Sequence, residues 1–84
     1  MVYKIYYRNT LDVRAPSIIS MHEYEEALFT VESKTRSSLL AAISKIDDPT
    51  VKVRQIKVGD AVSDEEGNFF IYTMFFQWAM VEVA

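Results

Sequence analysis

The chain has 84 residues, of which 50% are hydrophobic and 25% are charged, and its formal net charge is −3 at neutral pH. This composition is typical of one compact domain, because a disordered chain holds fewer apolar residues and more unbalanced charge. The sequence contains no cysteine and one histidine, which excludes disulfides, thiolate metal sites, a cysteine nucleophile and a His-rich metal centre. It also lacks the basic excess that is typical of nucleic-acid-binding proteins.

The first element expected in chain order is a strand over residues 2–8. Tyr3, Ile5 and Tyr7 share one face of this strand, as a period of two requires. A long irregular connection that contains a proline is expected over residues 9–22. Because this connection also holds several large aliphatic side chains, it must either pack back on the domain or contact a partner.

A second strand is expected near residues 25–32, followed by a helix over about residues 33–46. Ser33 is the expected N-cap of this helix, and Asp47-Asp48-Pro49 ends it because proline cannot continue a helix. The strand directs alternate apolar side chains toward the core, namely Ala27, Phe29 and Val31. The buried stripe of the helix has the spacing i, i+4, i+7 and comprises Leu39, Ile43 and Ile46.

A third strand is expected over residues 51–58. The apolar alternation changes phase within it, which predicts a bulge near Arg54-Gln55, and Gly59 marks a second irregularity. Residues 63–68 are typical of a polar turn, with a glycine available for positive φ.

Residues 69–76 are almost continuously apolar and aromatic, which predicts a central strand buried on both faces. Residues 77–83 either extend this strand or form a short edge strand beyond it. The resulting order is β-β-α-β-β in a single α+β domain over residues 1–84. One helix packed on an antiparallel or mixed sheet of four or five strands buries these apolar stripes most simply.

The sequence indicates no catalytic group. His22 lies beside Glu23, but adjacent residues rarely face each other, and no serine has the neighbours of a catalytic nucleophile. Neighbouring carboxylates fall in an expected strand, helix end and turn rather than converging, and these pairs are Glu25-Glu26, Asp47-Asp48 and Glu65-Glu66. Two glycines cannot supply a phosphate-binding loop. We therefore expect no enzyme activity, no cofactor and no metal site.

The charges are unevenly distributed along the chain. Residues 34–57 hold six basic and two acidic groups, whereas residues 58–84 hold five acidic groups and no base. Such a bipolar surface can steer a charged protein partner, although solvated faces that happen to segregate would produce the same pattern. The predicted partner-binding residues are basic, namely Lys34, Arg36, Lys52, Arg54 and Lys57.

The aromatic side chains on the proposed strands resemble the stacking platform of a single-strand RNA binder. The C-terminal ones lie in an acidic segment that would repel a phosphate backbone, which favours core packing for most of them. Tyr6 and Trp78 are candidates for a protein-binding patch, because tyrosine and tryptophan are enriched among interface anchors.

The opening MVYKIYYR, Pro16, the segment ALFTVES with its following helix, and TVKVRQIKVGDA resemble the small epsilon subunit of RNA polymerase from low-GC Gram-positive bacteria. The resemblance covers about residues 1–62, and the sequence departs from the family from Phe69 onward. It implies a protein that docks on core RNA polymerase without entering the chemistry. The epsilon fold is similar to that of a small phage inhibitor of RNA polymerase, so a phage-encoded binder is equally consistent. The strand followed by an amphipathic helix is also similar to the β-grasp layout, but a C-terminus without Gly-Gly disfavours a conjugated modifier.

The sequence therefore predicts a non-enzymatic protein-binding module that docks on bacterial RNA polymerase, as an accessory subunit or a phage-encoded regulator. The alternatives are a phage-encoded inhibitor of another bacterial target, such as a CRISPR nuclease or a DNA-processing enzyme, and a nucleic-acid-binding protein. A cytoplasmic location is expected, with no membrane contact, because no signal-peptide stretch or membrane span is evident. Homodimerisation through an edge strand stays open.

Overall fold

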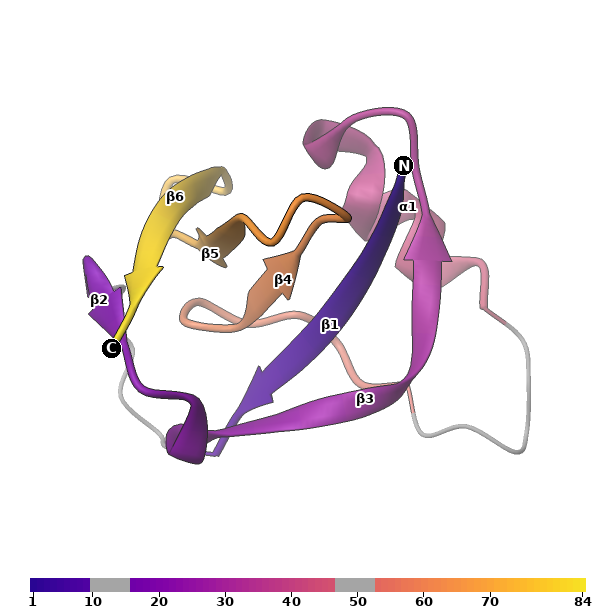
Figure 1. Cartoon of the computed structure of the whole chain (residues 1–84). Coiled ribbons are helices and arrows are strands. Elements are labelled where there is room, and N and C mark those ends of the chain that lie inside the picture. The colour runs from indigo at the N-terminus through magenta and orange to yellow at the C-terminus, as the bar shows by residue number, and fades with distance from the viewer. Residues whose placement is uncertain (10–15, 47–52) are drawn as a thin grey trace.

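The computed structural model describes residues 1–9, 16–46 and 53–84. Within these ranges one short helix, α1 (Leu39–Ser44), packs on a six-stranded mixed sheet of order β2-β6-β5-β4-β1-β3 (Figure 1). Only β2 and β6 pair in parallel among the described strands. The strands are β1 (Val2–Arg8), β2 (Ile18–Ile19), β3 (Tyr24–Glu32), β4 (Ala61–Ser63), β5 (Phe69–Tyr72) and β6 (Trp78–Val83), and two single 3₁₀ turns are η1 (Met21–Glu23) and η2 (Arg36–Ser38). The predicted α+β class is confirmed, with more strands than the four or five expected.

The sheet buries side chains on both faces, and β1 contributes to both. Tyr3, Ile5 and Tyr7 are buried on the helix side, together with the predicted helix residues Leu39 and Ile43. Tyr6 points to the opposite face and belongs to a second buried cluster, whose other members are Ile19, Tyr24, Ala61, Ile71 and Val81. The connection before β3 therefore packs back on the domain through Ile19, which is one of the two outcomes that its aliphatic content predicted.

The predicted strand near residues 25–32 is confirmed as β3. Val31 is buried, and Ala27 and Phe29 pack against the same core from partly exposed positions. The register between β3 and β1 shifts between Lys4 and Tyr6, where an irregularity interrupts the ladder.

The helix begins later than predicted, and Ser33 is not its N-cap. The backbone N–H of Ser33 donates to the Met1 carbonyl at 2.9 Å, which continues the pairing of β3 with the start of the chain. Because the sheet holds this residue, the chain turns first through η2, and α1 starts at Leu39. Ile46 packs against the core as the stripe predicted, while Asp47-Asp48-Pro49 lies outside the described residues.

The third predicted strand is wrong over residues 53–58, which carry no strand, and residues 51 and 52 lie outside the described ranges. Because these residues form no strand, the prediction of a bulge at Arg54-Gln55 is also wrong. Here backbone N–H groups donate to side chains rather than to a neighbouring strand. The N–H of Arg54 donates to Tyr7 Oη at 3.3 Å, and the N–H of Lys57 donates to Asp60 Oδ2 at 2.7 Å. The irregularity predicted at Gly59 is confirmed, with φ +98°.

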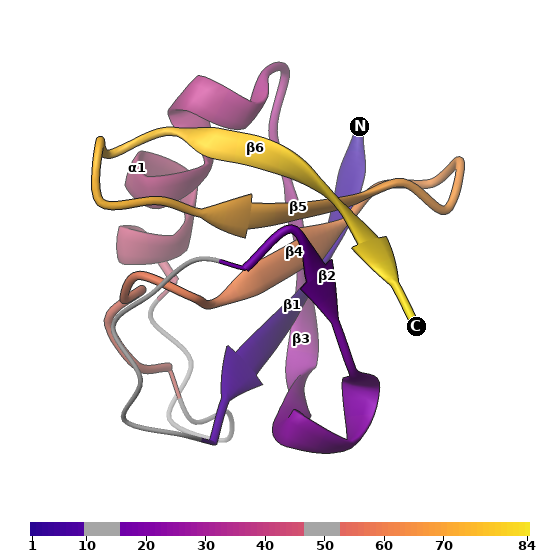
Figure 2. The same cartoon turned by 90° about the vertical axis from the view of Figure 1, so that its left-hand side faces the viewer.

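The predicted strand over residues 69–76 ends early, at Tyr72. A turn follows, and β6 pairs with β5 as a hairpin. On its other side β6 pairs with the two-residue β2, which is an edge strand of the described sheet. Figure 2 shows this turn at the same end of the sheet as α1, whereas the turn between β4 and β5 projects from the other end. In the described ranges no helix has the length and apolarity that crossing a membrane requires.

Candidate functional site

The two hairpin turns that flank β5 have the same hydrogen-bond pattern. In the first, the N–H of Asp64 donates to the Asn68 carbonyl at 3.0 Å and the N–H of Gly67 to the Asp64 carbonyl at 3.2 Å. In the second, the N–H of Thr73 donates to the Gln77 carbonyl at 2.9 Å and the N–H of Phe76 to the Thr73 carbonyl at 3.0 Å. Each is therefore a three-residue loop.

A side chain caps each turn from its first position. The N–H of Glu66 donates to Asp64 Oδ1 at 2.9 Å, and in the second turn the N–H of Phe75 donates to Thr73 Oγ1 at 3.3 Å. Burial of Asp64 acts to raise its pKa, but hydrogen bonds from Asn68 and Glu66 and the nearby charge of Arg36 outweigh this and hold the pKa of Asp64 below its usual value. The predicted polar turn is confirmed.

The two turns differ at the position that needs a left-handed backbone. Gly67 takes φ +85° there, as glycine does without steric penalty. The corresponding residue of the second turn is Phe76, with φ +59°, the one non-glycine residue with positive φ among those described. A bulky side chain in this region is a conformational outlier.

The second turn also exposes its apolar side chains to solvent. We call residues 74–76 the docking turn, since Met74, Phe75 and Phe76 are 60%, 75% and 81% exposed. The prediction that residues 73–76 are a buried strand is thus wrong. The missed signal is the spacing Thr-x-x-x-Gln, which matches the Asp-x-x-x-Asn of the first turn.

A groove runs beside the docking turn, between α1 and residues 53–58. It consists of a hollow of about 560 Å³ and an adjoining one of about 300 Å³, which share Leu40, Tyr72 and Phe76. We call it the arginine groove, because Arg36 and Arg54 are the charged residues among the described ones that line it. The remaining lining residues are Ser37, Ile43, Ser44, Val53, Gln55, Ile56, Val58, Gln77 and Trp78.

The structure brings two of the predicted partner-binding residues to this groove. Arg36 lines it in η2, with its guanidinium carbon 4.0 Å from the centre of the Phe70 ring. Lys34 and Lys57 are exposed but do not line the groove, and Lys52 lies outside the described residues. A role for these residues in partner binding stays a prediction.

Arg54 also has a structural role in the fold. Its Nη2 donates to Asp60 Oδ1 at 3.1 Å and to the Arg8 carbonyl at 3.2 Å, and its guanidinium lies 4.4 Å from the centre of the Tyr7 ring. Asp60 is 1% exposed and also accepts from the backbone N–H groups of Arg8 and Lys57. The pair fixes residues 54–60, which include most of one wall of the groove, against β1.

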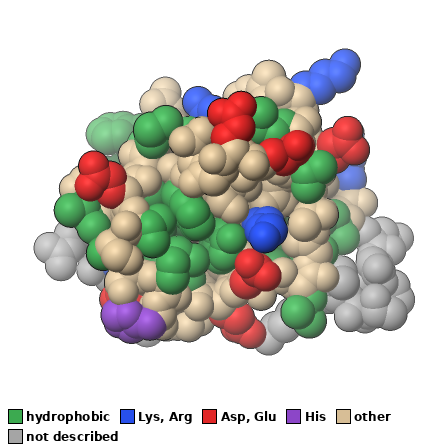
Figure 3. Space-filling model, viewed as in Figure 1, with side chains coloured by type: hydrophobic (Ala, Val, Ile, Leu, Met, Phe, Trp, Pro, Cys, Tyr) green, Lys and Arg blue, Asp and Glu red, His purple; other side chains and the backbone are tan. Residues whose placement is uncertain are grey.

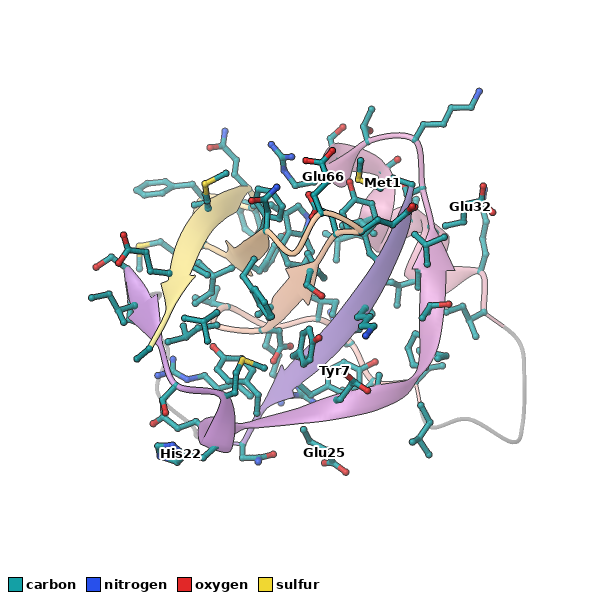
Figure 4. The ribbon with its side chains drawn as sticks, in the orientation of Figure 1. Met1, Tyr7, His22, Glu25, Glu32 and Glu66 are labelled. Atoms are coloured by element: carbon teal, nitrogen blue, oxygen red, sulfur yellow. The ribbon has the colours of Figure 1, made fainter. Side chains whose placement is uncertain are left out.

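Among the described groups considered for catalysis, none lines this groove, and Asp47-Asp48 lies outside the described residues. In Figure 4, His22 lies in η1, Glu25 on β3 and Glu66 in the first turn, at separate places around the molecule. His22 is exposed, with Nδ1 2.6 Å from Ser20 Oγ. Of the residues that the structure describes, no three His, Asp or Glu side chains are arranged to hold a metal ion.

A different face carries a second group of hydrophobic side chains. Figure 3 shows them over β2 and β6, where Ile18, Met80 and Val83 are exposed. These side chains lie on strands, at residues that do not share the positive φ of Phe76.

Comparison with protein-family models, with curated proteins and with solved structures finds no match to this chain. The geometry of the docking turn and the arginine groove is therefore the basis for assigning a function.

Proposed function

We propose that this protein is a non-enzymatic protein-binding module that docks on a larger protein through the docking turn and the arginine groove. The observation that carries this proposal is Phe76, an aromatic residue at a left-handed turn position where the matching turn has Gly67. Its side chain is largely exposed, so packing within the chain does not compensate for the backbone strain.

Energetics favour an external partner for this turn. A left-handed backbone destabilises a residue with a Cβ by about 1–2 kcal/mol, whereas glycine avoids this penalty. Burying one phenylalanine or methionine side chain against a partner contributes about 1.5–3 kcal/mol. The strain at Phe76 is therefore offset only when the docking turn is covered. Strained residues of this kind gather at sites of function.

The chemistry of the site favours a protein over a nucleic acid or a substrate. The docking turn is uncharged, and the chain as a whole carries a net charge of −3, which disfavours a phosphate backbone. The lining residues that the structure describes include no histidine and no carboxylate, the usual acid–base groups.

Bacterial RNA polymerase is the first partner to test, because the resemblance of residues 1–62 to the epsilon subunit suggests it. An accessory subunit and a phage-encoded regulator would both dock in this way. An inhibitor of a CRISPR nuclease or of a DNA-processing enzyme would use the same docking turn on another target.

Biolayer interferometry with purified core RNA polymerase from a low-GC Gram-positive bacterium tests this assignment. The double variant Phe75→Ser, Phe76→Ser is compared with Leu28→Ser, which removes an 85% exposed leucine from β3. We expect the double variant to weaken binding by about 30-fold or more, as loss of an interface anchor does, and the control to bind like wild type. If the wild-type protein does not bind, RNA polymerase is excluded as the partner; if both variants bind normally, the docking turn is excluded as the site.

A further inference from the structure

We propose that the arginine groove binds a peptide segment in which apolar side chains are flanked by carboxylates, with a carboxylate on Arg36. This inference deepens the proposed function and rests on it, since it names the chemistry of the partner at the same site. The observation behind it is a contrast of charge. Among the described residues that line the groove, the charged side chains are arginines, whereas in the chain as a whole acidic residues outnumber basic ones.

The shape of the groove fits side chains rather than a flat surface. Its two hollows meet at Leu40, Tyr72 and Phe76, so a bound segment can place apolar groups in both. Ligand sites in proteins typically have volumes of about 300–1,000 Å³ and mostly apolar walls. Ile43, Ile56 and the other apolar lining residues supply such walls here.

The two arginines contribute differently to the charge of the groove. Arg54 is paired with the buried carboxylate of Asp60, so its charge is largely compensated within the fold. Arg36 is exposed, and its guanidinium lies over the Phe70 ring, which limits the conformational freedom lost on binding. Arg36 also lines a neighbouring hollow together with Asp64 and Glu66, and its charge helps to lower the pKa of Asp64. The carboxylate of Asp64 already accepts hydrogen bonds from the N–H groups of Glu66 and Asn68. Arg36 is therefore the group that selects a carboxylate, which guanidinium binds with two parallel hydrogen bonds.

A second copy of this chain fits the groove less well. In a two-fold contact the same patch meets itself, so the arginine ends of both copies would lie close together. The docking turn offers no carboxylate to separate them, because residues 73–77 are uncharged. An anionic membrane is also disfavoured by the net charge of −3.

Selection from an unbiased display library of random 12-residue peptides tests the inference. Peptides are selected on the wild-type protein and counter-selected on the variant Phe75→Ser, Phe76→Ser, so that only binders that need the docking turn remain. We expect the enriched sequences to combine aromatic or aliphatic residues with a net negative charge. Enrichment of neutral or basic sequences overturns the inference but leaves the proposed docking site intact. If no enriched peptide depends on the docking turn, the inference also fails, and the polymerase measurement above decides separately on the proposed function.

Charge reversal at one position then locates the carboxylate. Fluorescence anisotropy with the most enriched acidic peptide is measured for Arg36→Glu and for Lys34→Glu, a matched change two residues away that does not line the groove. We expect Arg36→Glu to weaken binding about tenfold and Lys34→Glu to change it less than about twofold. If the two variants have equal effects, the attraction comes from the overall surface charge, and the role of Arg36 is overturned. Dimers that form without peptide in sedimentation would assign the site to a second copy of the chain and overturn the inference. Binding of the wild type to phosphatidylserine vesicles that depends on Phe75 would assign the site to a membrane and overturn the inference as well.

Discussion

The phenol of Tyr24 donates a hydrogen bond of 2.6 Å to the backbone carbonyl of Gly59, which lies 35 positions further along the chain. This bond joins the first residue of β3 to the tight turn before β4, next to the ion pair of Arg54 and Asp60. Burial raises the pKa of Tyr24 above 10.0, the nearby carboxylates of Asp60 and Glu23 raise it further, and Arg8 opposes them.

Replacing Tyr24 should change how stability responds to alkaline pH. Because the pKa of Tyr24 is higher in the folded than in the unfolded state, its contribution is complete below pH 10.0 and is lost as the pH rises above that value. Tyr24→Phe removes this dependence and weakens the fold at neutral pH by about 1 kcal/mol, the value of one hydrogen bond. Urea unfolding followed by the fluorescence of Trp78 measures both, and a constant difference between the two proteins from about pH 8 to pH 11 would contradict the expectation.

Replacing Phe76 by glycine should stabilise the free protein. Gly67 in the matching first turn shows that a turn of this type accepts glycine at the left-handed position. Phe76→Gly should therefore relieve strain and raise the free energy of unfolding by about 1 kcal/mol. The same change removes an exposed aromatic side chain and should weaken partner binding. Phe75→Gly is the control, because Phe75 has no positive φ and should show no such gain. A Phe76→Gly protein no more stable than wild type in urea would show that the backbone there is unstrained.

The converse change in the first turn should destabilise the protein. A Cβ at Gly67 meets no atom within 4 Å, so any effect of Gly67→Ala reports the backbone conformation alone. At φ +85° we expect a loss of about 1 kcal/mol in the free energy of unfolding. Thermal unfolding by circular dichroism is the measurement, and an unchanged midpoint would refute the expectation.

Removal of the buried carboxylate should be the most damaging of these changes. Asp60→Ala leaves Arg54 and the N–H groups of Arg8 and Lys57 without their acceptor, which should lower the free energy of unfolding by about 3 kcal/mol. Asp60→Asn keeps one acceptor oxygen and should lose less. Glu66→Ala, at an exposed turn position, is the control and should change stability by no more than about 0.5 kcal/mol. Urea denaturation compares the three, and similar losses for Asp60→Ala and Glu66→Ala would contradict the structural role of the ion pair.

Local pattern was enough for the elements whose residues interact with near neighbours or alternate regularly. The alternation of Tyr3, Ile5 and Tyr7 predicted β1, the stripe of Leu39 and Ile43 predicted the buried face of the helix, and Gly67 predicted a turn. Each depends on a period or on a backbone preference that a few consecutive residues express by themselves.

Elsewhere, contacts between distant residues overrode that pattern. The pattern predicts that Ser33 begins a helix, but its N–H donates to the Met1 carbonyl directly after β3. Arg54 sits in an apolar alternation typical of a strand, but its side chain reaches Asp60 and Tyr7. Phe76 ends a run that looks buried, yet the pairing of β6 with β5 places it in an exposed turn. The periodicity and composition of a segment show how apolar it is. The long-range hydrogen bonds and ion pairs of the folded chain determine which residues of that segment face water. They therefore also determine where the docking turn and the arginine groove lie.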